Sequence, residues 1–196
     1  MKTVIVLAAL LAASTLGTAA EAGAQNLGPQ RRFIALGGYG SALLLDRGGS
    51  FDERAAGAGG GGRLMINLAP LSGPGRNLLD HATLGGFFSS FAAEDGVSAR
   101  HYGGEVDVHL TVVPLGKVLD PFVAVGIGRL STNVAGMGKD AQLAVSPGAG
   151  VRIPVANYLE LRADARDVIV FGSRLRGAGE ETTHNLELTA GLYLRL

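Results

Sequence analysis

The sequence predicts an all-β protein: an eight-stranded antiparallel up-and-down transmembrane barrel, preceded by a cleavable signal peptide. Three observations predict it. Many segments alternate apolar and polar residues with a period of two, which is the pattern of a strand with one apolar and one polar face. No segment offers a helical stripe of useful length. After an apolar start of 14 residues, from 3 to 16, no window is long and apolar enough for a spanning helix.

Composition narrows the possible classes of protein before any motif is considered. The chain has 196 residues, one domain in length, with 17 basic and 17 acidic side chains. A net charge of zero argues against a nucleic-acid partner, which requires a basic excess or patch. The chain has no cysteine, which excludes disulfide frameworks, zinc ribbons, Fe–S clusters and thiol catalysis. We expect no cofactor and no metal.

The first residues have the layout of a secretory signal peptide. Lys2 gives a positive start, an apolar run follows to Leu16, and small residues up to Ala24 suit a cleavage site. We therefore predict a signal peptide over 1–24 and a barrel domain over 25–196. Cleavage after Ala22 is the close alternative.

The clearest alternation runs from Arg100 to Val112, and a second one of equal quality runs from Asn185 to Leu196. Glycine- and proline-containing turn signals separate the segments. The two segments near 33–45 and 82–92 are apolar enough for strands, but their inward and outward faces stay undecided. The eight predicted strands are 32–45, 56–68, 81–92, 99–113, 121–130, 142–153, 158–167 and 184–196.

The polar faces of these strands favour a membrane barrel, apolar outside and polar inside, over a soluble one. They are poor in lysine, and their arginines and carboxylates balance, which suits a closed internal network where an unpaired charge is costly. Eight strands enclose an interior that side chains fill, so we expect a plugged lumen. The predicted luminal network consists of Arg63, Glu105, Asp107, His109, Arg152, Glu160, Arg162, Asp164, Arg166, Glu187 and Arg195.

Four segments carry a resemblance to a known family; they lie at 121–128, 148–154, 159–164 and 185–196. In these segments the chain resembles the small outer-membrane β-barrel family of Gram-negative bacteria, of the OmpA-membrane-domain and OmpX type. The resemblance implies location in the cell outer membrane, contact with outer-membrane lipid and lipopolysaccharide, a monomer, and recognition of the last strand by the barrel-assembly machinery. Family members usually end in an aromatic residue, whereas this chain has Leu196 there, and it has no tryptophan for the aromatic girdles.

Several motifs suggest chemistry, and each has a simpler structural interpretation. The G-x-G-x-x-G match at 57–62 precedes a strand pattern, so it indicates glycines in a curved strand. His101, Glu105, Asp107 and His109 share a face, but residues two apart on a strand are too far apart to bind a metal alone. His184 opens the last strand, in a segment that departs from the His-x-Ser-Asn pattern of the PagL lipid A-modifying enzymes.

The connections predict orientation and function. We expect both chain ends in the periplasm, because an even strand number returns the chain to its starting side. The connections near 46–54, 93–98, 131–141 and 168–183 would then face outside, and by these boundaries they average longer than the others. Arg174 and Arg176 in the last of them suit contacts with phosphate. We expect a non-enzymatic protein with a structural or surface-interaction role. The alternatives are a lipid A-modifying enzyme of PagP or PagL type and a soluble periplasmic ligand-binding barrel.

Overall fold

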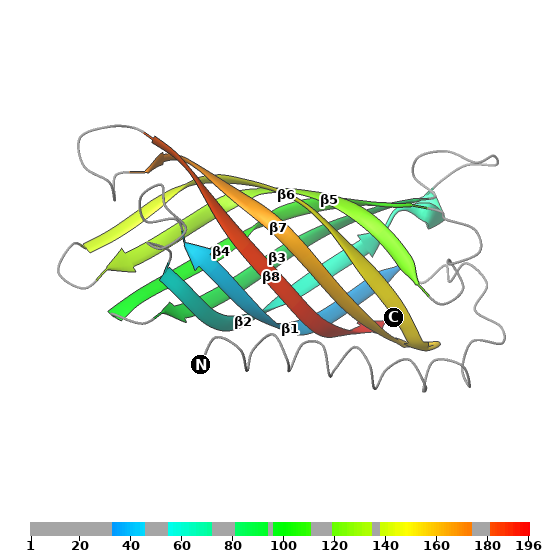
Figure 1. The fold of residues 1–196 in the computed structure, drawn as a ribbon. Coiled ribbons are helices and arrows are strands. Elements are labelled where there is room, and N and C mark those ends of the chain that lie inside the picture. Colours follow the sequence, from blue (N-terminus) through cyan, green and yellow to red (C-terminus); the bar gives the residue numbers. More distant parts are fainter. Residues whose placement is uncertain are drawn as a thin grey trace.

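Eight strands form one closed antiparallel barrel in which each strand pairs with its sequence neighbour and the last pairs with the first (Figure 1). The computed structural model describes residues 33–45, 55–71, 81–93, 96–110, 119–134, 138–173 and 181–196. The strands are β1 (Ile34–Leu45), β2 (Ala55–Asn67), β3 (Ala82–Ala93), β4 (Val97–His109), β5 (Asp120–Val134), β6 (Gly138–Ala156), β7 (Leu159–Ser173) and β8 (Glu181–Arg195). A single 3-10 turn, η3 (Ala69–Leu71), follows β2. The predicted fold class and strand number are confirmed.

The barrel has two ends, which we name by the chain segments found there. The terminal end is where β1 begins and β8 finishes, and the C-terminus marks it in Figure 1. The distal end is where β1 joins β2, β3 joins β4, β5 joins β6 and β7 joins β8. Within the described ranges, no helix is both long and apolar enough to cross a membrane.

Strand ends near the distal end differ from the prediction. The segments 131–134, 138–141, 168–173 and 181–183 were predicted as parts of connections but belong to β5, β6, β7 and β8. The distal connections therefore average shorter than 68–81, 110–119 and 157–158, so the predicted length asymmetry was wrong. These strands have 15, 19, 15 and 15 residues. About 9–11 suffice to cross a bilayer, so the strands continue past that span. β4 ends at His109, and residues 111–118 lie outside the described ranges.

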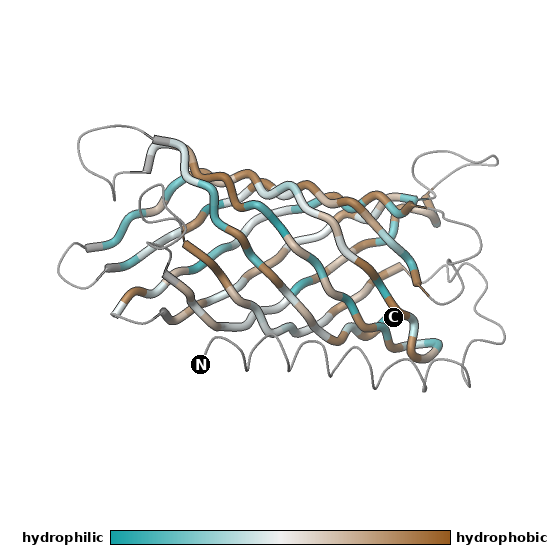
Figure 2. Tube along the Cα trace, viewed as in Figure 1, coloured by the Kyte–Doolittle hydropathy of each residue, from teal (hydrophilic) through white to brown (hydrophobic). Residues whose placement is uncertain are grey.

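Polar and apolar residues alternate along the strands (Figure 2), and every strand exposes large apolar residues on its outer face. On β5, Val125 and Ile127 are 58% and 60% exposed, whereas Asp107 on the neighbouring strand β4 is fully buried. The molecule therefore has a charged interior and an apolar outer wall. On the two strands whose facing the sequence left undecided, the inward side chains include Tyr39 on β1 and Phe87 on β3.

The lumen is divided along its axis into an apolar and a charged part. The distal part holds a hydrophobic cluster that alternation alone did not predict, because two of its contributing strands had no assigned face. We call it the distal plug; it consists of Leu43, Leu45, Phe91, Val97, Ala99, Leu130, Ala144, Val168 and Val170. The charged residues lie nearer the terminal end.

Glycines make room for two tyrosines where β1 closes the barrel against β8. Gly37 lies opposite Tyr193, and Tyr39 lies opposite Gly191. A Cβ added to Gly191 would come within 2.5 Å of the Tyr39 Cβ, and one added to Gly37 within 2.5 Å of the Tyr193 Cγ. Only glycine leaves space for an aromatic ring to lie across the seam at these positions.

Candidate functional site

The candidate site is a cluster of ion pairs in the lumen, to which β2, β4, β6 and β7 contribute. All of its side chains are at least 94% buried. We call it the central cluster; its members are Arg63, Glu105, Asp107, Arg152, Arg162, Asp164 and Arg166. Alternation places Arg162, Asp164 and Arg166 on one face of β7, and barrel closure brings β4 across to them.

Each carboxylate of the central cluster bridges two or more arginines. Asp107 lies 2.7 Å from Nη2 of Arg152 and 2.5 Å from Nη1 of Arg162. Asp164 lies 3.0 Å from Arg63, 3.0 Å from Arg162 and 2.6 Å from Arg166. Sharing of this kind offsets the desolvation of both partners, because each of these two carboxylates has more than one cationic partner.

Glu105 completes the cluster between β2 and β7. Its Oε1 lies 2.9 Å from Nε of Arg63, and its Oε2 pairs with Nη1 of Arg166. Four arginines thus face three carboxylates within the central cluster, and the fifth arginine and the other two carboxylates of the predicted network, Arg195, Glu160 and Glu187, pair elsewhere.

Aromatic rings contact the arginines that carry this excess positive charge. The guanidinium carbon of Arg162 lies 4.1 Å from the Phe122 ring centroid, and that of Arg152 lies 5.2 Å from the same centroid. Arg63 lies 4.9 Å from the centre of the Tyr39 ring. In addition, Arg166 lies 5.5 Å from the centre of the Phe87 ring. An aromatic face attracts a cation most where water is excluded, as it is here.

Three of the predicted network residues, Arg195, Glu160 and His109, form two separate pairs nearer the terminal end. Arg195 places its Nε 3.0 Å from Oε2 of Glu160. His109 donates from Nδ1 to Oδ2 of Asp120 at 2.7 Å, and its Nε2 lies 2.9 Å from the Thr83 hydroxyl.

Glu187, the remaining predicted residue, belongs to a third group with Ser89 and His101. Nδ1 of His101 donates to Oε2 of Glu187 at 2.7 Å, and the Ser89 hydroxyl donates to Oε1 at 3.1 Å. All three are at most 2% exposed. The carboxylate therefore lies between serine and histidine, whereas nucleophile activation requires the histidine beside the hydroxyl.

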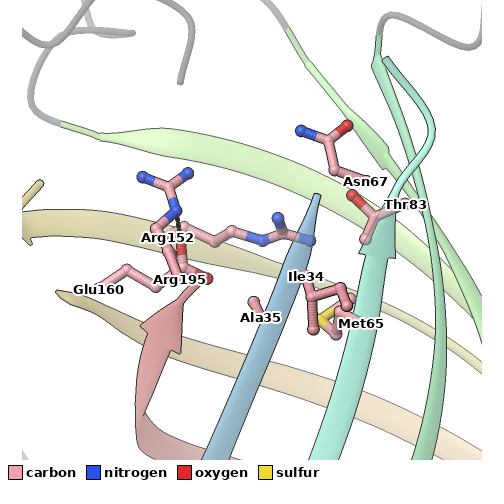
Figure 3. A pocket seen from close by; sticks show the side chains of 8 residues that line it. All are labelled: Ile34, Ala35, Met65, Asn67, Thr83, Arg152, Glu160 and Arg195. Atoms are coloured by element: carbon pink, nitrogen blue, oxygen red, sulfur yellow. Dashed lines mark ion pairs between the residues drawn. The ribbon is translucent and has the colours of Figure 1, made fainter. Parts of the chain in front are cut away.

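A small polar pocket opens beside the Arg195–Glu160 pair at the terminal end of the barrel (Figure 3). Figure 3 shows the Arg195–Glu160 pair on one side and Thr83 with Asn67 on the other. The full lining is Ile34, Ala35, Met65, Asn67, Thr83, Arg152, Glu160 and Arg195. Its empty volume of about 280 Å³ includes open solvent, so it is a mouth of the lumen and not a deep ligand cavity.

A further histidine pair lies on the outer wall. His184 on β8 donates from Nδ1 to Oδ2 of Asp167 on β7 at 2.8 Å, and both side chains are exposed. The same-face neighbours of His184 along β8 are Thr182 and Leu186. Among the described residues, no group of three or more His, Asp or Glu is arranged to hold a metal. Arg174 and Arg176 lie outside the described residues, as does the predicted signal peptide.

Sequence reasoning missed the aromatic and hydroxyl partners of the luminal charges. Tyr39, Phe87 and Ser89 lie on β1 and β3, the strands whose facing the sequence left open. Phe122 was missed because its neighbours at 124, 126 and 128 are alanine or glycine. On β3 the odd positions carry Thr83 and Ser89 and the even positions carry Ser90, a difference too small to assign the inward face from the sequence.

The similarities of this chain to known proteins are similarities to solved structures. No protein-family model and no curated protein sequence matches the chain. Neisserial surface protein A is similar with a TM-score of 0.58 and 12% identity, over 83% of this chain and 97% of that one. OprG of Pseudomonas aeruginosa is similar with a TM-score of 0.49 and 7% identity, over 86% of this chain and 98% of that one. Ail of Yersinia pestis is similar with a TM-score of 0.48 and 11% identity, over 84% of this chain and 97% of that one.

The identities are low, so the comparison speaks to the fold alone, and only the first of these scores carries an argument. That match runs through nearly the whole length of the neisserial protein, and it agrees with the closed eight-stranded topology. The chain therefore has the eight-stranded barrel fold of the small outer-membrane proteins.

Proposed function

We propose that this chain is a non-enzymatic outer-membrane barrel with a structural or surface-interaction role exerted through its external connections. One observation carries the proposal: the polarity is inverted relative to a water-soluble protein. The outer wall exposes large apolar residues on all sides, including Leu36, Phe88, Val125, Leu143 and Leu192, while arginines and carboxylates are buried. Water would penalise this wall, and a bilayer would solvate it.

The alternative of a soluble periplasmic barrel requires the reverse arrangement. A soluble barrel that binds an apolar ligand has an apolar interior, whereas this interior contains the central cluster. Cell fractionation separates the two: we expect the protein in the outer-membrane fraction, resistant to salt and carbonate washes. Recovery in the soluble periplasmic fraction would contradict the proposal.

We further propose that the lumen does not conduct. The ion pairs of the central cluster and the side chains of the distal plug occupy successive parts of the interior, which supports a closed barrel. Planar-bilayer recording of the purified, refolded protein should give no stable current steps, with a porin as the positive control. A large and steady conductance would overturn this part of the proposal.

Surface contacts would come from the distal connections, which the two-ended topology places outside if the chain termini are periplasmic. Arg174 and Arg176 are the proposed contacts with lipopolysaccharide phosphate in this region. A variant with both changed to glutamine should bind less to lipopolysaccharide-coated surfaces, while its folding in detergent stays unchanged.

The barrel-assembly machinery is the other proposed partner, through β8. This strand closes the barrel against β1 and presents Leu192, Leu194 and Leu196 outward. A synthetic peptide of residues 181–196 should compete with other outer-membrane barrels for assembly in membrane extracts. A peptide with the three leucines changed to serine is the matched control.

One observation bears on the enzymatic alternative: the oriented His184–Asp167 pair on the outer wall. A lipid hydrolase would also need a nucleophilic serine beside the histidine, and the neighbours on that face are Thr182 and Leu186. Mass spectrometry of lipid A from cells with the gene, without it and with His184→Gln should give the same spectrum. Loss of an acyl chain that depends on His184 would establish the alternative instead.

A further inference from the structure

Two exposed arginines lie next to each other on the outer wall, where β4 and β5 approach the distal end. Arg100 pairs across the strands with Ser131, and Arg129 pairs with Tyr102. The two arginines are therefore diagonal neighbours on one face, about 7 Å apart or less at Cβ, within mutual reach of their long side chains. Within the described ranges neither guanidinium contacts a carboxylate.

The position of this pair relative to the apolar wall is informative. Along β4 and β5, the outward residues toward the terminal end are apolar or aromatic, as in Tyr102, Val106 and Ile127, all more than 40% exposed. Toward the distal end they are polar, as in Ser98 and Asn133, both exposed. The arginines thus stand at the edge of the apolar wall. At such an edge the long arginine side chain can lay its aliphatic stem along apolar surface while its guanidinium group reaches the polar layer.

The other charged pair on the outer wall behaves differently. His184 on β8 and Asp167 on β7 pair with each other at 2.8 Å. On β6, the strand next to β5, Lys139 lies directly opposite Asn133 on the same outer face. Its side chain is also basic and exposed. The excess positive charge at the edge of the wall is therefore local to β4, β5 and β6, and it is uncompensated by the described residues.

We propose that Arg100 and Arg129 bind the phosphate monoester of a lipid headgroup of the lipid A type, in the leaflet at the distal end. Two guanidinium groups on adjacent strands present paired N–H donors, which match phosphate oxygens bidentately. The exposed hydroxyls of Ser90 and Ser98 lie on the same face beside them, and Ser90 pairs directly with Arg100. The inference rests on the proposed membrane location, because the edge of the apolar wall is a headgroup layer only in a bilayer.

The test measures lipid retained by the full chain in detergent micelles, by native mass spectrometry. The probes are diphosphorylated lipid A, its enzymatically dephosphorylated form and phosphatidylglycerol, which carries a phosphodiester. The wild type should retain phosphorylated lipid A over both other lipids. Each of Arg100→Gln and Arg129→Gln should weaken retention by about fivefold, the scale of one arginine at an anionic membrane surface. The matched control, Asp167→Asn with His184→Gln on the opposite wall, should behave as the wild type.

Several outcomes would overturn the site, and they are separable from a failure of the proposed function. Equal retention of the phosphorylated and dephosphorylated lipids by the wild type would do so without any variant. Retention of phosphatidylglycerol at the level of lipid A would refute the monoester assignment. If the wild type inserts into liposomes but shows no preference, only this inference fails. If it does not insert at all, the membrane location fails as well.

Discussion

Asp107 is the single residue whose replacement best tests whether the charged face lies inside. It is fully buried and pairs with Arg152 and Arg162. Asp107→Asn removes the negative charge and leaves two guanidinium groups without this partner, which should lower the free energy of unfolding by about 3 kcal/mol or more. Urea titration of the protein in detergent micelles measures this loss.

The same change at Asp167 is the matched control. That carboxylate is exposed on the outer wall and contacts only His184 in the pairs described above. Asp167→Asn should change the free energy of unfolding by less than about 0.5 kcal/mol. A loss that small at Asp107 would instead favour a soluble barrel with its polar face outward.

Val106 tests the opposite face of the same strand. Its side chain is 43% exposed on the outer wall, one residue away from two inward carboxylates. Val106→Arg places a charge in the apolar wall and should cost about 2–4 kcal/mol of stability in a bilayer if the position lies near the midplane. Because the chain has no tryptophan for fluorescence, the shift in gel mobility on heating measures the folded, inserted fraction. Val106→Leu should insert normally, and normal insertion of the arginine variant would contradict a lipid-facing wall.

At the scale of elements, the seam between β1 and β8 depends on alternating glycine and tyrosine. Gly191 faces inward, and a methyl group there would overlap Tyr39 and the Gly38 carbonyl. Gly191→Ala should therefore destabilise the barrel by about 1–3 kcal/mol through overpacking. Thermal unfolding in detergent measures the loss.

Gly40 provides a control on the same seam. It pairs with Ala190 on the outward face, and an added Cβ there meets nothing within 4 Å. Gly40→Ala should be neutral or slightly stabilising, because it only restricts the unfolded chain. Equal losses for the two variants would show that the seam tolerates no added methyl on either face and would remove the role assigned to Tyr39.

At the scale of the whole molecule, the even strand number places both chain ends at the same end of the barrel, and the proposed orientation has no support from the lengths of the connections. Near the distal end, residues that were predicted in connections belong to the strands. The lengths of the connections therefore do not indicate which end of the barrel faces outside. Trypsin added to intact cells should cleave after Arg174 or Arg176 and spare Arg76. The reverse pattern would invert the barrel in the membrane.

The sequence was most informative where one face of a strand is consistently polar. On β4, β7 and β8, carboxylates and arginines at alternate positions predicted an inward charged face, and their side chains are buried in the barrel except for the partly exposed Arg195. On β1 and β3 the residues of both faces are mostly glycine, alanine, serine or apolar. The two-residue period therefore does not show which face points inward. The facing of Tyr39, Ser89 and Phe91 was undecidable for that reason.

The sequence by itself determined the strand number, the closed antiparallel class and the face of the clearest strands, because a two-residue period and turn residues are local properties of the chain. Only the tertiary structure decided which charges meet. Asp107 pairs with Arg152 and Arg162 across the lumen, and Glu187 pairs with His101 and not with an arginine. Period fixes the side of the wall on which a residue lies, whereas contact across the lumen depends on strand register and barrel closure, and these involve all eight strands at once.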